Sequence, residues 1–136
     1  MEDIMTLFEK IVAGDIPSKK IYEDDTVFAF LDISQATPGH TLVIPKEATE
    51  SVLTASPEVV ASVNKVAQQI AIKLIGTLNA SGVNILTNAN DVSGQTVPHY
   101  HVHVIPRYSH DELKFVTQKH DQTLDDVYAK LKDLFE

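Results

Sequence analysis

Apolar positions along the chain follow two different periods, and these separate strands from helices. Short apolar runs bounded by turn residues predict strands at residues 20–23, 26–32, 40–46 and 83–88. Residues 99–106 alternate with period two, which predicts a fifth strand. The centre of the run at 40–46 is continuously apolar, so we expect that strand to lie inside the sheet with both faces covered.

Three further segments carry helix signals. Thr6 and Glu9 match a capping box and predict a short helix that reaches residue 13. Ser56 precedes a proline and an acid, which predicts a long helix ending near residue 74 or 78. Thr123 starts a last helix at about 123–135, whose apolar stripe must be covered by its own sheet or by a partner subunit. Both alternatives are open at this point.

Size and pattern together indicate one domain over residues 1–136. A chain of 136 residues and 15.0 kDa has room for a single hydrophobic core. Five strands with helices before, between and after them predict an α+β fold, in which a five-stranded and mainly antiparallel sheet carries a long central helix. Short N-terminal and C-terminal helices complete it.

Charge and composition exclude several classes of partner. A net charge of −8 argues against nonspecific binding to nucleic acid or to an anionic membrane. The absence of cysteine excludes disulfides and thiolate metal sites. Residues 1–3 are acidic, unlike a signal peptide, and no apolar run approaches the roughly 18 residues of a membrane span. We therefore expect a cytoplasmic protein.

The predicted strand at 99–106 places His99, His101 and His103 on one face, and the apolar residues between them face a core. A solvated or hydrogen-bonded strand face is the least informative explanation. A metal site is a stronger alternative, although at about 3.3 Å per residue the outer two Cα atoms lie about 13 Å apart. The favoured interpretation is an anion site, because neutral imidazole is a nucleophile near pH 7 and a second imidazole can hold an anionic oxygen.

The residues before this strand support an anion site. Small and flexible residues at 93–96 can present consecutive backbone N–H groups to phosphate oxygens, and Thr96 adds a hydroxyl. Taken alone, the same residues are an ordinary turn signal.

Asn88, then Gly-Gln-Thr-Val-Pro at 94–98, then His-x-His-x-His and Ile-Pro-Arg at 105–107, resemble the signature of the histidine triad (HIT) family of nucleotide-binding hydrolases and transferases. The resemblance extends over most of the chain. It implies the HIT-like fold, a purine nucleotide as small-molecule partner, and a homodimer whose sheets join edge to edge. It implies no cofactor.

The resemblance also implies the roles of individual residues. His101 would attack the α-phosphorus of a nucleotide derivative, His99 and His103 would hold its nonbridging oxygens, and His40 would support the triad. The residues implied to bind the nucleotide are Leu7, Phe8, Ile11, Phe30, Asp32, Ile33, Asn88, Gly94, Gln95 and Thr96. Simpler roles stay open for some of them: core packing for Leu7, Phe8 and Ile11, a solvated strand end for Asp32, and a loop cap for Asn88.

One departure from bacterial relatives bears on metals. Many of them carry a Cys-x-x-Cys and a later histidine that help to hold zinc, whereas this chain has Thr6, Glu9 and Ala48 there. We therefore expect no metal. Two other classes of function remain as alternatives to the enzyme, namely a regulatory module that binds nucleotide with little turnover and a metal-binding protein. For the enzyme itself, nucleoside phosphoramidates and dinucleoside polyphosphates are both candidate substrates.

Overall fold

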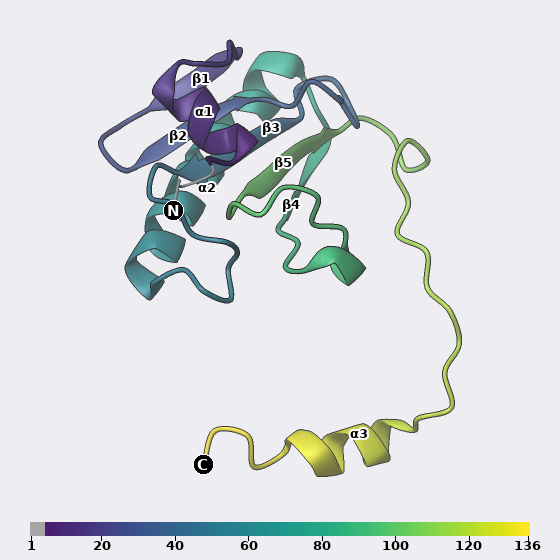
Figure 1. Ribbon diagram of the computed structural model, residues 1–136. Helices are drawn as coiled ribbons and strands as arrows, with labels where there is room; N and C mark the ends of the chain where they lie inside the picture. The colour runs from purple at the N-terminus through teal and green to yellow at the C-terminus, as the bar shows by residue number, and fades with distance from the viewer. Residues whose placement is uncertain (1–4) are drawn as a thin grey trace.

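The structure, a computed structural model, describes residues 5–136, so the acidic start that argues against a signal peptide lies outside the described residues. Five strands form one sheet in the order β1-β2-β3-β5-β4, and every neighbouring pair is antiparallel (Figure 1). This confirms the expected α+β fold. In chain order the elements are α1 (Leu7–Ala13), β1 (Lys20–Glu23), β2 (Val27–Leu31), β3 (Thr41–Pro45), α2 (Pro57–Leu78), β4 (Gly82–Leu86), the short 3₁₀ turn η1 (Asp91–Ser93), β5 (Val102–Arg107) and α3 (Leu124–Leu131).

Both faces of the sheet are covered, which explains the continuous apolar runs of β2 and β3. On one face, Val27, Ala29 and Val43 pack against α2 together with side chains from β5. On the other face, Phe28 and Phe30 pack with residues of α1 and β3. Successive strand residues point to opposite faces, so a strand enclosed on both sides needs apolar residues at every position.

The first two helices begin as their sequences predict. Both hydrogen bonds of the capping box between Thr6 and Glu9 are present, and α1 ends at Gly14, whose φ of 85° is left-handed and suits glycine. The Ser56 side chain caps α2 by accepting a hydrogen bond from the backbone N–H of Val59. α2 then lies against one face of the sheet (Figure 1), where its apolar side chains pack on those of the strands.

The histidine segment departs from the predicted strand at its first residues. β5 begins at Val102, so His99 and His101 precede it. The reason lies in the backbone hydrogen bonds, because the N–H of Tyr100 donates to the carbonyl of Thr49, which follows β3, rather than to a neighbouring strand. The alternation itself holds, since Tyr100 and Val102 lie in the core beneath α2 while the histidines face the other way.

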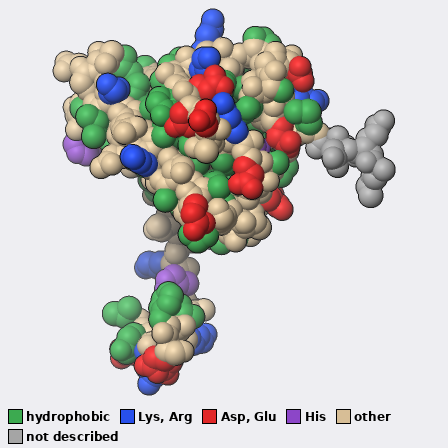
Figure 2. Space-filling model, turned by 90° about the vertical axis from the view of Figure 1, so that its left-hand side faces the viewer, with side chains coloured by type: hydrophobic (Ala, Val, Ile, Leu, Met, Phe, Trp, Pro, Cys, Tyr) green, Lys and Arg blue, Asp and Glu red, His purple; other side chains and the backbone are tan. Residues whose placement is uncertain are grey.

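The C-terminal residues stand apart from this body. α3 begins after Thr123 as predicted but ends at Leu131 instead of near residue 135. None of its residues is buried. α3 lies clear of the sheet in Figure 1, and the space-filling view at right angles shows the end of the chain apart from the main body (Figure 2). Among residues 5–136, no helix combines the length and apolar character needed to cross a bilayer.

Candidate active site

Strand register assembles a cavity on the face of the sheet that α1 covers. Phe30 pairs with Leu42, and Leu42 pairs with His103, so one row of side chains crosses β2, β3 and β5 on the same face. The cavity has a volume of about 220 Å³. Its lining residues are mostly apolar and are Leu7, Phe8, Ile11, Ile16, Pro17, Phe30, Asp32, Ile33, Leu42, Thr96, Val97, His101 and His103.

His101 presents a free ring nitrogen because its other nitrogen is occupied. Its Nδ1 lies 2.6 Å from the backbone carbonyl oxygen of His99, and a carbonyl only accepts, so Nδ1 carries the proton. In the neutral ring Nε2 then holds a lone pair. The Phe8 ring packs on this imidazole in a T-shaped arrangement with 5.0 Å between centroids, which fixes the plane of the imidazole. His101 therefore has the two properties that a nucleophile needs here, a free Nε2 lone pair and a ring held in a fixed orientation.

His40 sets the tautomer of His103 through a chain of hydrogen bonds. The backbone N–H of Ala36 donates to Nδ1 of His40 over 3.1 Å, so in neutral His40 the proton is on Nε2. That Nε2 lies 2.9 Å from Nδ1 of His103 and donates to it. Neutral His103 must then carry its own proton on Nε2. The site thus holds an N–H donor in the ring beside the free lone pair of His101, with 5.1 Å between the ring centroids.

His99 lies elsewhere than expected. Its ring is 1 % exposed and is absent from the cavity wall, and its Nε2 donates to the carbonyl of Pro45 over 2.8 Å. Its Nδ1 has no hydrogen-bond partner among the described residues. What His99 offers to the site is its backbone carbonyl, which holds His101.

The imidazoles are held in their neutral forms. Burial lowers the pKa of His99 and that of His101. Burial, helped by the neighbouring rings of His101 and His40, lowers the pKa of His103 to about 4. At pH 7 the triad therefore supplies uncharged rings, which a nucleophile requires.

The carboxylate of Asp32 borders the cavity and is already oriented by the protein. Its Oδ1 accepts a hydrogen bond from the backbone N–H of Ser34, and its Oδ2 lies 3.6 Å from Nε2 of His40. Ligand atoms of Asp32, His40 and His103 lie within 4.8 Å of one another. Three N and O donors at this spacing match the protein ligands of a catalytic zinc site, so a metal is the alternative that geometry allows.

The loop from β4 to β5 places only one of its four predicted residues at the cavity, and this is Thr96. Gln95 holds the loop together, since its amide donates to the carbonyls of Glu50 and Val97. Gly94 has a φ of 107°, and the amide of Asn88 lies 3.5 Å from where a Cβ on Gly94 would stand. Asn88 and Gly94 thus lie together beside the cavity rather than in its wall.

The remaining predicted nucleotide-binding residues all line the cavity. They are Leu7, which is 47 % exposed, with Phe8, Ile11, Phe30, Asp32 and Ile33. Sequence reasoning missed four wall residues, Ile16, Pro17, Leu42 and Val97. A signal that could have identified Leu42 is strand pairing, because Leu42 of β3 is paired with His103 of β5 and the two side chains lie on the same face of the sheet. For the other three, a turn and a loop give no periodicity to follow.

The low pKa of His103 predicts that folding stability falls in acid. The unfolded ring has an ordinary pKa near 6.5 and the folded ring about 4, so the unfolded state takes up the proton first as pH falls. The stabilisation is complete above pH 6.5 and is lost towards pH 4. The two pKa values correspond to about 3 kcal/mol, which we reduce to about 1–2 kcal/mol because the ring is partly exposed.

Urea unfolding at pH 7 and pH 4.5 measures this loss. The variant His103→Asn cannot titrate, so its stability should change less between the two pH values, by about 1–2 kcal/mol. His120→Ala, which removes an exposed histidine, is the control and should behave as the wild type does. An equal pH dependence in His103→Asn and wild type would contradict the prediction.

Known proteins share this sequence and architecture. The family model described as the HIT domain matches residues 13–110. Protein hit from Bacillus subtilis is 49 % identical over 102 residues, which cover 75 % of this chain and 70 % of that protein. A crystal structure of a Streptococcus mutans protein superposes with a TM-score of 0.87 at 45 % identity, covering 98 % of this chain and 84 % of that one.

A more distant match is the crystal structure of a hypothetical histidine triad nucleotide-binding protein from Sulfolobus tokodaii. Its TM-score is 0.74 at 31 % identity, and the match covers 93 % of this chain and 87 % of that chain. The match to the HIT domain includes the triad, the supporting His40 and the lining residues of the cavity from Ile16 onwards, whereas Leu7, Phe8 and Ile11 precede the matched residues. The chain therefore belongs to the HIT family.

Proposed function

We propose that this protein binds purine nucleotide derivatives and cleaves them at the α-phosphate through a nucleotidyl-histidine intermediate. The observation that carries the proposal is a pair of neighbouring imidazoles whose tautomers are set by separate hydrogen bonds, that of His101 to the His99 carbonyl and that of His103 to His40. These bonds leave a free Nε2 lone pair on His101 and an Nε2–H on His103, with 5.1 Å between the ring centroids. Such a pair joins a nucleophile to a donor for a phosphoryl oxygen. A HIT-family relative whose name includes nucleotide binding supports the ligand class.

The apolar part of the cavity is suited to a nucleobase. Phe8, Phe30 and Ile11 are buried at its base, and Leu7 and Ile33 form an exposed rim that a bound base would cover. Purines present a larger apolar ring face than pyrimidines, which favours them in a slot of this kind. Asp32, at the polar end, would accept hydrogen bonds from the ribose hydroxyls.

The chemistry proceeds in two displacements. Nε2 of His101 attacks the α-phosphorus, a P–N bond forms, and the bond to the leaving group breaks with its electron pair going to that group. Water then attacks the same phosphorus and gives up a proton, which balances the negative charge that the leaving group took away. The P–N bond breaks with its electron pair returning to Nε2, and the mononucleotide and neutral His101 are released. Splitting one difficult displacement into two lowers the barrier of each.

The other residues act by position and charge. The Nε2–H of His103 would donate to a nonbridging oxygen, where a fixed donor lowers the barrier most. Thr96, at the cavity wall, is placed for the leaving-group side, with Gln95, Gly94 and Asn88 shaping its loop. His40 and His99 are positioning residues, because each orients a reacting ring through one hydrogen bond. No cofactor takes part in this scheme.

We also propose that two copies of the chain join at the β4 edge of the sheet. Among the described strands, β1 and β4 form the two edges of the sheet. The charged residues Lys20 and Glu23 and an irregular register make β1 unfavourable for pairing with another chain. β4 has the uncharged sequence Gly-Val-Asn-Ile-Leu, and its Ile85 is 43 % exposed. Pairing of β4 with its copy would remove an edge that otherwise invites aggregation.

Turnover by chelator-washed protein tests the proposed function. An adenosine phosphoramidate and a diadenosine polyphosphate are supplied side by side, and products are measured with and without added Zn²⁺. We expect turnover without metal, and a covalent adenylate on the peptide carrying residues 99–107 when the reaction is stopped in alkali. The relative rates identify the preferred leaving group.

Three outcomes would redirect the proposal. Tight nucleotide binding with neither product nor adduct would make the protein a regulatory binding module. Activity that disappears on chelation and returns with Zn²⁺ would assign the site at Asp32, His40 and His103 to a metal. Stoichiometric zinc without nucleotide turnover would make it a metal-binding protein.

A further inference from the structure

The C-terminal arm, residues 109–136, carries an apolar helix face that is left exposed by the other residues of the described range 5–136. Along α3 and the turn that follows, apolar residues recur every three or four positions, and five of them are 52–97 % exposed. These five are Leu124, Tyr128, Leu131, Leu134 and Phe135. In Figure 2 the end of the arm forms a lobe of its own, separate from the body.

An isolated helix of this length requires packing to persist. α3 has eight residues, whereas helices shorter than about 12 residues are marginal in water even with favourable sequences. Its N-terminus is capped by Thr123, whose side chain accepts from the N–H of Asp126 over 3.1 Å. A cap contributes little against this length penalty, so the apolar face needs a surface to pack on.

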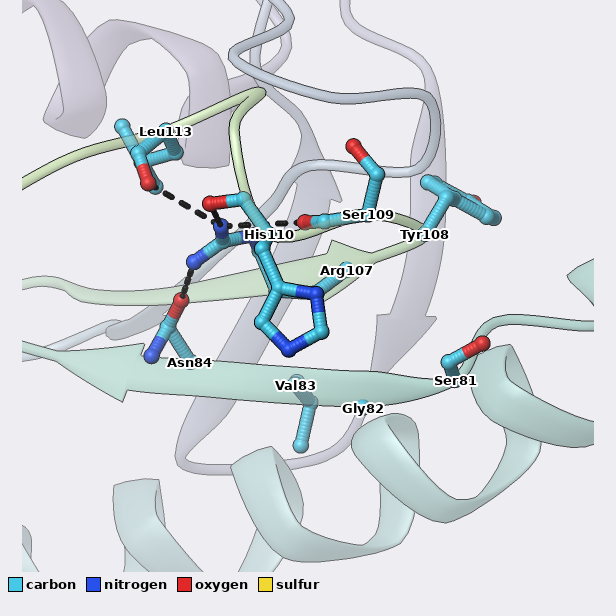
Figure 3. Close-up of a pocket in the computed structure, with 9 residues that line it drawn as sticks. All are labelled: Ser81, Gly82, Val83, Asn84, Arg107, Tyr108, Ser109, His110 and Leu113. Carbon is cyan, nitrogen blue, oxygen red and sulfur yellow. Dashed lines mark hydrogen bonds between the residues drawn. The ribbon is translucent and has the colours of Figure 1, made fainter.

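The root of the arm is fixed to the body by Arg107 (Figure 3). Its guanidinium donates to the side chain of Asn84 on β4 over 2.6 Å and to that of Glu112 over 3.1 Å. It also donates to three backbone carbonyls at the start of the arm, those of Ser109, His110 and Leu113. The direction in which the arm leaves is therefore set by the folded body, at its edge strand.

This direction carries the arm over the open edge of the sheet. Asn84 lies in β4, which is the last strand on its side of the sheet among the described residues, so the arm departs where the proposed dimer partner would join. Residues 109–123 span up to about 50 Å when extended, enough to cross a neighbouring body. The superposition on the Streptococcus mutans crystal structure covers 98 % of this chain and so takes in the arm. The HIT domain match, in contrast, ends at residue 110.

We propose that the arm crosses to a second copy of this chain and that the apolar face of α3 packs on that copy's body. The two arms of a dimer would exchange reciprocally, as two-fold symmetry requires. The proposal rests on the dimer of the previous section and is independent of the chemistry of His101. In this proposal the part of the chain that matches the HIT domain carries out catalysis, and the arm serves dimer assembly.

A matched pair of variants in the full-length chain tests it. Leu131→Glu places a charge in the apolar face, whereas Ala129→Glu places the same charge on the opposite side of α3. Sedimentation over a concentration series measures dimer dissociation, and hydrogen exchange measures protection of the α3 amides. We expect wild type to protect α3 only at concentrations where it is dimeric. Leu131→Glu should raise the dissociation constant at least tenfold and abolish that protection, while Ala129→Glu should change neither.

Each of the other possible results would overturn the proposal that the two copies exchange their arms. Protection of α3 that persists on dilution to monomer would place the helix on its own body. A dimer with unprotected α3 would mean that the face serves a different partner, although the β4 edge still joins the two copies. A monomer at every concentration would remove the dimer as well. Nucleotide turnover is measured in the same samples, so failure of the arm and failure of the proposed chemistry are distinguishable.

Discussion

Replacement of His101 by alanine should lower kcat for both candidate substrates by at least about 10⁴-fold. The reason is that Nε2 of His101 is the proposed attacking atom, and its loss removes the covalent route, leaving only the binding and donor contributions of the site. Steady-state turnover of the adenosine phosphoramidate measures the effect. Mass spectrometry should detect no adenylate on the variant.

A control separates loss of chemistry from loss of fold. His120→Ala removes an exposed histidine in the arm and should keep the wild-type rate. The His101→Ala variant should still bind adenosine monophosphate within about tenfold of wild type, because the apolar walls and Asp32 are unchanged. Full turnover by His101→Ala would contradict the assignment of the nucleophile.

The pair formed by His40 and His103 should show strong coupling in a double-mutant cycle. His103→Ala removes a donor to the phosphoryl group and should lower kcat/KM by about 10²–10³-fold. His40→Ala leaves the His103 ring in place but removes the hydrogen bond that sets its tautomer, and we expect kcat/KM to fall about tenfold. The double variant should be no slower than His103→Ala alone, since His40 acts only through its partner.

The conservative variant His40→Gln distinguishes positioning from general destabilisation. A glutamine amide keeps an N–H donor for Nδ1 of His103, so it should recover most of the rate lost in His40→Ala. In His40→Ala the acidic limb of the pH profile should also move upward, because one of the causes that lower the pKa of His103 is removed. Additive losses in the cycle would indicate independent roles.

The sequence by itself determined the faces of the sheet and the kinds of chemistry. Period-two alternation placed Tyr100 and Val102 in the core and the histidines opposite, and this placement holds although residues 99–101 precede β5. Caps and turn residues fixed the starts of all three helices, since these signals are local hydrogen bonds that involve only a few neighbouring residues. The HIT signature similarly required no knowledge of the fold.

Tertiary structure alone decided what each imidazole does. Only the packing of the segment after β3 against residues 99–101 gave His99 a carbonyl partner at Pro45 and turned it away from the cavity. Only the antiparallel register brought His40 to His103, which are 63 positions apart in the chain. The direction of the arm likewise depends on Arg107 meeting Asn84. Periodicity assigns a residue to a face, but tautomers, burial and chain direction depend on contacts between distant segments, and those exist only once the chain has folded.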